Sequence, residues 1–188
     1  VKKTRWLLTL TILFSLIPIS IAVNLDKKLH DRMIKQTFAE VLKNNKVNVF
    51  SEGHQNHMIS ALKMFKDNKL FGKGIKNFRV LCKKPEFYEK ITSCSSHPHN
   101  TYVQLLAETG LIGFSFVFFI FLFICKELLF YFWRSFFDNG QKVDNQKIII
   151  TILIFVNLFP FAPSGSFFNN WLSIIYFLPL GFYLNRLK

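Results

Sequence analysis

The sequence predicts an all-α polytopic membrane protein with about four transmembrane helices and one large helical loop outside the membrane. Three observations support this prediction: apolar residues form long uncharged blocks, 51% of the 188 residues are hydrophobic, and phenylalanine occurs 24 times. The net charge of +13 predicts an anionic partner. Because no basic–aromatic pattern with base-reading polar groups accompanies this charge, we expect membrane lipids and no nucleic acid.

Long uncharged runs place the helices, since a span needs about 20 mainly apolar residues to cross about 30 Å of hydrocarbon. The runs cover Trp6–Val23, Thr109–Cys125 and Ile148–Asn185. The last run is broken by "FPFAPSGSFFNNW", in which Pro160 and Pro163 cannot donate a backbone hydrogen bond within a helix. We therefore expect helices near residues 6–23, 107–130, 147–162 and 168–185, of which the third is short for a span.

The first run also has features of a secretory signal peptide, because the basic residues "KKTR" precede its apolar core. No small-residue cleavage site follows it, since the next residues are "VNLDKKLHD". We therefore expect a retained helix.

Charged residues beside the spans predict the orientation of the chain. The short flanks carry Lys2, Lys3, Arg5, Lys126, Arg134, Lys142, Lys147, Arg186 and Lys188, and four spans would place all of them on the cytoplasmic side. The long segment 24–106 then lies outside, although it holds 15 Lys/Arg against 7 Asp/Glu, because long loops translocate largely regardless of charge. The expected parts are an N-terminal helix at 1–23, the outer loop at 24–106 and three helices with a cytoplasmic linker at 107–188.

The outer loop has helical periodicity in two places, "LDKKLHDRMIKQTFAEVL" and "HMISALKMFKDNKLFGKG". Two amphipathic helices with solvated lysines are expected, and Gly72 and Gly74 follow the second helix as stops. Cys82 and Cys94 lie in the same loop, where an oxidising compartment favours a disulfide over free buried thiols. Cys125 falls within a span, where we expect it to pack.

The junction between the outer loop and the second span holds "SSHPHN", with His97 and His99 on either side of Pro98. Three interpretations are open. A metal site would join these histidines to His54 and His57, although no Asp or Cys completes a recognised ligand pattern. A structural histidine pair is the second, and general acid–base chemistry by a histidine that titrates near working pH is the third.

Polar residues then recur every four positions at Asn100, Gln104 and Glu108, so they share one face of a helix. Asn100 or Glu108 is expected to orient His99. A carboxylate in the first turn of a span is expensive unless it faces the interior of the protein. The following Gly110 and Gly113 are expected to allow close helix packing.

Two motifs in this order resemble the O-antigen ligase and polysaccharide polymerase family of bacterial membrane glycosyltransferases. "HNTYVQLLAETGLIG" fits the family pattern of His-Asn, nine residues and Gly-x-x-Gly, and "FGKGIKNFR" fits its Gly-x-Gly-x-x-Asn-Phe element. The resemblance covers about residues 50–135 by motif and the rest by the order of spans alone.

The resemblance implies a metal-independent enzyme without cofactors. Its donor would be an undecaprenyl-diphosphate-linked glycan, and its acceptor a lipid A core or another glycan, at the periplasmic face of the bacterial inner membrane. By that resemblance His99 is the catalytic base and Arg79 holds the donor diphosphate, while His97, Asn100 and Glu108 support them. Guanidinium suits this role because it binds phosphate oxygens bidentately. Lys73 and Lys76 could add positive charge beside the glycine turn, although we expect both to be solvated lysines, and Arg32 is a weaker alternative to Arg79.

The chain also departs from the family pattern. "SEGHQNH" places His54 where many members carry an arginine, so the second diphosphate contact is either lost or passed to His54. Complete members have about a dozen spans, so we expect this chain, which begins at Val1, to be a C-terminal part that is inactive alone. The alternatives are a polymerase of the same family, an inactive membrane fragment that binds lipid or a partner, and a periplasmic metal sensor.

Overall fold

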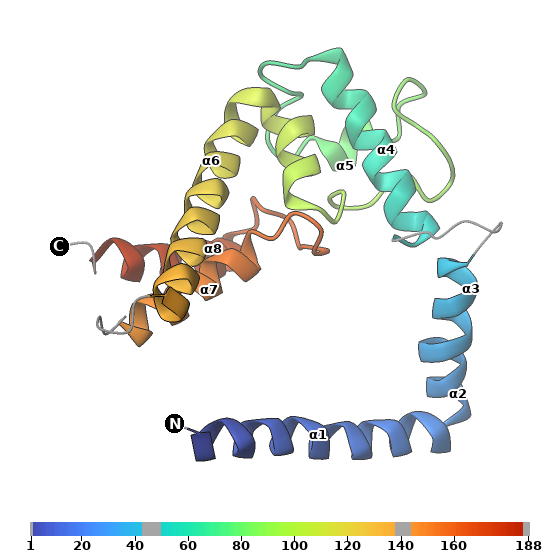
Figure 1. Ribbon diagram of the computed structural model, residues 1–188. Coiled ribbons are helices and arrows are strands. Elements are labelled where there is room, and N and C mark those ends of the chain that lie inside the picture. Colours follow the sequence, from blue (N-terminus) through green and yellow to red (C-terminus); the bar gives the residue numbers. More distant parts are fainter. Residues whose placement is uncertain (1, 43–49, 138–143, 186–188) are drawn as a thin grey trace. The chain divides into compact units, whose positions relative to one another are not determined.

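The computed structural model describes residues 2–42, 50–137 and 144–185, and every regular element in these ranges is a helix (Figure 1). The predicted all-α class is therefore confirmed. Contacts divide the chain into two units, Val1–Glu52 and Gly53–Lys188. Of the cations used to predict orientation, Lys142, Arg186 and Lys188 lie outside the described residues.

Most of the described residues of the first unit are helical. Its elements are α1 (Lys2–Leu25), α2 (Lys27–His30), the π-helical turn η1 (Asp31–Gln36) and α3 (Thr37–Val41). Asp26 separates α1 from α2 by accepting hydrogen bonds from the backbone amides of Lys28 at 2.8 Å and Leu29 at 3.2 Å. Both helical predictions for this part of the chain, residues 6–23 and 25–42, agree with these elements.

The second unit begins with two helices and a cross-linked loop. They are α4 (Glu52–Asp67) and the single turn α5 (Phe78–Leu81). A disulfide joins Cys82, directly after α5, to Cys94, and their Cα atoms are 5.3 Å apart. A small core ties these segments to the next helix and consists of Ala61, Met64, Phe78, Cys82, Phe87 and Ala107.

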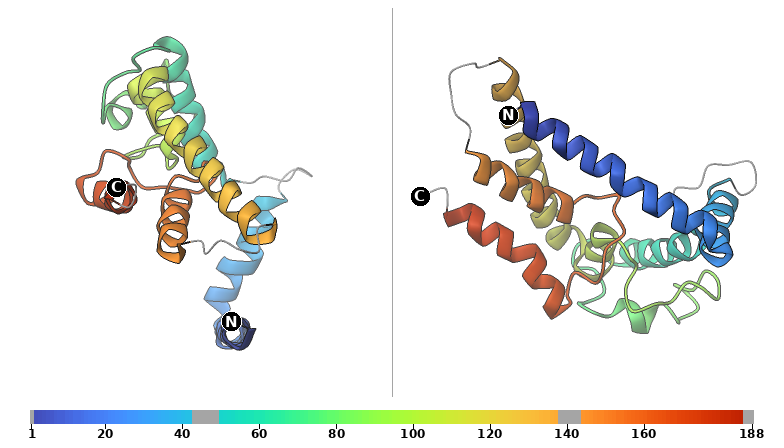
Figure 2. Two further views of the ribbon diagram at one scale, coloured as in Figure 1. Left: turned by 60° about the vertical axis from the view of Figure 1, so that its left-hand side comes forward. Right: turned by 90° about the horizontal axis from the view of Figure 1, so that it is seen from below.

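The rest of the second unit is a long helix packed against a helical hairpin (Figure 1, Figure 2). The long helix is α6 (Thr101–Phe137), and α7 (Asn145–Asn157) and α8 (Asn170–Asn185) form the hairpin. The helix predicted at 107–130 starts six residues earlier in the structure, at Thr101. Asn100 caps it by accepting a hydrogen bond from the backbone amide of Val103 at 3.0 Å. The core of this part comprises Tyr102, Leu105, Val117, Phe121, Ile124, Ile154, Leu158, Phe167 and Tyr183.

Helix α6 is broken at Gly110, which has φ 66° and ψ −161°. The segment after α4 crosses α6 at this break, with backbone hydrogen bonds from Lys73 to Ala107 at 2.8 Å and from Leu111 to Lys69 at 2.8 Å. A Cβ atom on Gly110 would overlap the backbone of Leu70. The expectation that Gly110 serves helix packing is therefore wrong, since it permits a kink and a backbone crossing instead.

Among the described residues, one helical stretch, Thr101–Arg134, is long and apolar enough to cross a membrane. Two shorter apolar stretches, Phe14–Leu25 and Asn145–Asn157, fall below that length. Many large apolar side chains of the second unit are exposed, including Phe116 at 69% and Leu129 at 69%, which suits a surface in contact with lipid or other helices.

Candidate functional site

Four histidines from two segments of the second unit form one cluster. His54 and His57 lie on α4, and His97 and His99 lie on the loop before α6. The ring of His99 is central, because its centroid is 4.2 Å from that of His97, 5.0 Å from that of His54 and 5.3 Å from that of His57. The structure therefore brings the expected base, His99, next to both His54 and His97.

The loop between α7 and α8 holds the two histidines before α6 in place. The backbone amide of Ser164 donates to the carbonyl of His99 at 3.0 Å, and the carbonyl of Ser164 lies 3.2 Å from Nε2 of His97. Nδ1 of His97 meets the hydroxyl of Ser96 at 2.8 Å. His99 itself has φ 57°, a left-handed conformation that side chains other than glycine seldom adopt. Its position thus depends on contacts with a distant segment.

Three histidines of the cluster, His57, His97 and His99, have lowered pKa values. Partial burial lowers the pKa of His99 to about 4, and the neighbouring charges of His97, His54 and His57 act in the same direction. Burial also lowers the pKa of His57 and that of His97. At neutral pH the His99 ring therefore carries an unprotonated nitrogen that can accept a proton.

A buried polar chain runs beneath this cluster along α6. Glu108, which is 1% exposed, accepts hydrogen bonds from the backbone amide of Phe78 at 3.0 Å and from the amide of Gln104 at 3.0 Å. Gln104 in turn accepts from the backbone amide of Phe167 at 2.9 Å. These hydrogen bonds thereby join the glycine-rich segment, α6 and the α7–α8 loop.

Asn100 and Glu108 are thus placed differently from the expectation that one of them orients His99. Asn100 donates to the carbonyl of Pro160 at 2.7 Å in addition to capping α6. Both side chains bond to backbone groups of other segments rather than to the His99 ring. Their contacts position the segments that carry the histidines.

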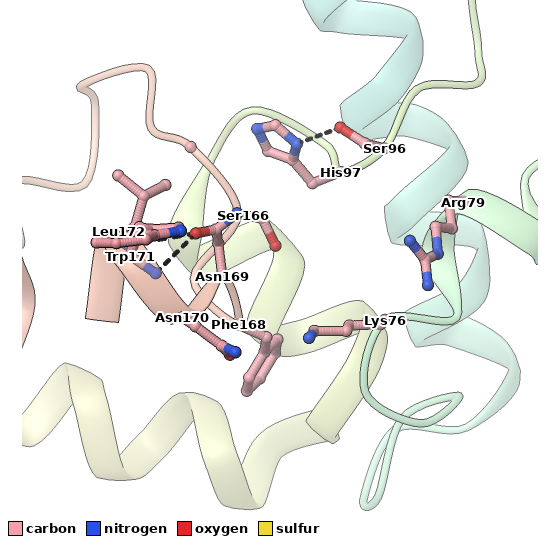
Figure 3. Close-up of a pocket in the computed structure, with 11 residues that line it drawn as sticks. Lys76, Arg79, Ser96, His97, Ser166, Phe168, Asn169, Asn170, Trp171 and Leu172 are labelled. Carbon is pink, nitrogen blue, oxygen red and sulfur yellow. Dashed lines mark hydrogen bonds between the residues drawn. The ribbon is translucent and has the colours of Figure 1, made fainter. Parts of the chain in front are cut away.

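A cavity of about 430 Å³ lies beside the cluster and is lined partly by Lys76, Arg79, Ser96 and His97 (Figure 3). Lys76 and Arg79 form one wall, and the residues that line the cavity include no carboxylate. Lys73 is paired with Asp67 and does not line it. The cavity therefore suits an anion, and guanidinium suits phosphate oxygens in particular.

His97 belongs to both the cavity and the histidine cluster, so it connects the expected diphosphate ligand Arg79 with the expected base His99. His54 and His99 are not among the residues that line the cavity. Arg32, the weaker alternative, lies in the first unit, on η1.

The opposite wall comes from a segment that the sequence analysis treats only as a helix break. The α7–α8 loop and the start of α8 line the cavity with Gly165, Ser166, Phe168, Asn169, Asn170, Trp171 and Leu172. The available signal was the polar run "FFNNW" inside an otherwise apolar segment.

The metal interpretation requires side chains that converge on one ion. Within residues 2–42, 50–137 and 144–185, no group of three or more His, Cys, Asp or Glu side chains is arranged to hold a metal ion. The four histidines lie near one another without converging on one point in this structure.

Comparison with known proteins identifies a family. A family model described as O-antigen ligase matches residues 1–119 of the 188. The matched range includes the Gly72–Phe78 segment, the histidine cluster and the break in α6. No curated protein and no solved structure matches the chain.

Proposed function

Because this chain belongs to the O-antigen ligase family, we propose that it transfers a glycan from undecaprenyl diphosphate to a sugar hydroxyl of a lipid A core. The observation that supports this reaction most directly is that His97 belongs both to the histidine cluster and to the cationic cavity. The description of the matching family favours ligation over polymerisation. We place the reaction at the periplasmic face of the bacterial inner membrane.

The proposed reaction is a displacement at the anomeric carbon of the donor. The acceptor hydroxyl forms the new glycosidic bond, its proton passes to His99, and the bond between the anomeric carbon and the phosphate oxygen breaks. The diphosphate leaves with the electron pair. Arg79 and Lys76 stabilise the negative charge that develops on it, which is where fixed cations lower the barrier most.

His99 suits the base role because its pKa, lowered to about 4, keeps it unprotonated at neutral pH. A bound diphosphate would favour the protonated ring, so substrate binding raises its basicity when the proton must be accepted. His97 and His54 flank the base and contribute to the substrate site. Asn100 and Glu108 act by positioning, since their side chains bond to backbone groups.

We also propose the four-span arrangement, with an N-terminal helix at 1–23, a periplasmic loop at 24–106 and three helices in 107–188. Support comes from α6, which contains a stretch of membrane length, and from the apolar character of α1, α7 and α8. The site then lies where the outer loop meets the membrane.

Replacing His99 by alanine tests the function. In the full-length protein, reconstituted with undecaprenyl-diphosphate-linked glycan and lipid A core, His99→Ala should reduce transfer at least a hundredfold, because general base catalysis typically contributes 10²–10⁴-fold. His30→Ala is the matched control, since His30 lies in the first unit outside the cluster. Normal transfer by a correctly inserted His99→Ala protein would remove the proposed base.

A further inference from the structure

The wall of the cavity opposite Lys76 and Arg79 presents two side chains that no step of the proposed reaction uses. Trp171 is 80% exposed and lines the cavity. Asn170 is exposed beside it, and within the described part of the chain its side chain forms no hydrogen bond. Figure 3 shows both residues across the cavity from the two cations.

This wall is fixed by hydrogen bonds to the rest of the site. Asn169 caps α8 by accepting from the backbone amides of Trp171 at 3.0 Å and Leu172 at 3.3 Å. The side-chain oxygen of Gln104 accepts a hydrogen bond from the backbone amide of Phe167, and the backbone amide of Ser164 donates one to the carbonyl of His99. The loop that leads to Asn170 and Trp171 is therefore tied to α6 and to His99, which carry the proposed chemistry.

The two side chains have the chemistry that a sugar ring requires. An indole ring offers a large, rigid apolar face on which the C–H groups of a pyranose can stack. A carboxamide supplies two donors and an acceptor for vicinal hydroxyls. A cavity of about 430 Å³ with cations on one wall and this pair on the other matches a phosphorylated sugar better than a simple anion.

We propose that Asn170 and Trp171 bind the first sugar of the donor glycan, the one bonded to the diphosphate. The proposal rests on the proposed function, which places the diphosphate at Lys76 and Arg79. The sugar is directly bonded to the distal phosphate, so it must lie within a few ångströms of those cations. The wall formed by Asn170 and Trp171 contributes side chains of the required kind within the same cavity.

An exposed tryptophan at the start of an apolar helix has another common role, which is to anchor the helix in the membrane interface. The two roles differ in what they recognise. Loss of a membrane anchor would change the affinity for every ligand, whereas loss of a sugar contact would change the affinity only for ligands that carry a sugar. Trp133 is a matched control, because it is 63% exposed on α6 and does not line the cavity.

The test measures the affinity of the full-length protein in phospholipid nanodiscs for two sets of ligands. One is bare undecaprenyl diphosphate, and the other is the same carrier with a single glucose, galactose or N-acetylglucosamine. We expect the wild type to prefer at least one sugar-bearing carrier. Trp171→Ala should lower that affinity about tenfold and Asn170→Ala about two- to tenfold, as expected for one stacking contact or one hydrogen bond. Both variants should bind the bare carrier normally.

The controls separate this proposal from the proposed function. Trp171→Phe should keep most of the preference, and Trp133→Ala and Asn185→Ala should keep all of it. The proposal is overturned if the wild type binds every carrier equally, or if Trp171→Ala weakens bare and sugar-bearing carriers alike. If Arg79→Ala leaves the affinity for bare carrier unchanged, the diphosphate assignment of the proposed function fails instead.

Discussion

Two residues of the candidate site, His99 and Lys76, have left-handed backbones with φ 57° and φ 61°. Such a conformation in a residue other than glycine costs on the order of 1–3 kcal/mol and persists only where the surroundings impose it. For His99 the surroundings include the hydrogen bond from Ser164 and the cap formed by Asn100. The strain is thus located at the proposed base, His99, and at Lys76, one of the two cations that line the cavity.

The pH dependence of transfer follows from the histidine cluster. In the proposed reaction the unprotonated form of His99 is the active one, and its pKa lies below the ordinary 6.5, at about 4. The acid limb of kcat/KM, which reports the free enzyme, should therefore fall below pH 6.5. His57→Gln removes one neighbouring charge and should move this limb to higher pH. A limb at or above pH 6.5 in the wild type, unmoved by His57→Gln, would contradict the lowering of the His99 pKa by its burial and by the neighbouring histidines.

Glu108 provides a second test at this scale. Glu108→Leu leaves the backbone amide of Phe78 and the amide of Gln104 without their acceptor in a buried place, which costs about 1–3 kcal/mol. The variant should unfold at a lower temperature in detergent and should transfer more slowly. Glu86→Leu is the control, because Glu86 is exposed on the cross-linked loop. Equal melting temperatures for the two variants would argue against the positioning role.

At the scale of elements, the crossing of α6 by the segment after α4 explains why both motifs contain glycine. Gly72 and Gly110 have φ 66°, and a Cβ atom on Gly72 would lie 2.5 Å from the carbonyl carbon of Glu108. Real Cβ contacts do not reach such distances, so neither position accepts a larger residue without displacement of the backbone.

Alanine at these glycines should therefore disrupt the site. Gly72→Ala and Gly110→Ala should each lower the melting temperature and abolish most transfer, because they separate the segment bearing Lys76 and Arg79 from α6. Gly53→Ala is the matched control: no atom lies within 4 Å of the added carbon, and alanine favours a helix by about 1 kcal/mol over glycine. Wild-type stability in Gly110→Ala would show that the crossing is not tight.

The elements also show which features the sequence could predict. Helical periodicity predicts the helices that contain Met33 and Met64, and the uncharged run Thr109–Cys125, extended to a helix at 107–130, predicts the start of α6 to within six residues. The crossing was not predictable, because Gly72 and Gly110 meet only through tertiary packing. Trp171 was missed because its apolar neighbours suggested a span, and only the fold brings it to the same cavity as Arg79.

At the scale of the whole molecule, the proposed four spans place the outer loop and the α6–α7 linker on opposite sides of the membrane. A single cysteine at Lys69 should react with an impermeant maleimide added from the periplasmic side, and one at Gln146 should react only after the membrane is permeabilised. Both variants would be made in a chain without the native cysteine Cys125, which is free. Labelling of Lys69→Cys only from the cytoplasmic side would show that the orientation is the reverse of the proposed one.

The proposed function assigns donor binding to Arg79 and proton transfer to His99. Donor affinity and the single-turnover transfer rate, measured together on Arg79→Ala and His99→Ala in the reconstituted protein, test this division. We predict that His99→Ala binds undecaprenyl-diphosphate-linked glycan with wild-type affinity and transfers it at least a hundredfold more slowly. Arg79→Ala should lose affinity about tenfold or more, as expected for a charge-assisted contact. Wild-type transfer by His99→Ala, or wild-type affinity in Arg79→Ala, would contradict the account.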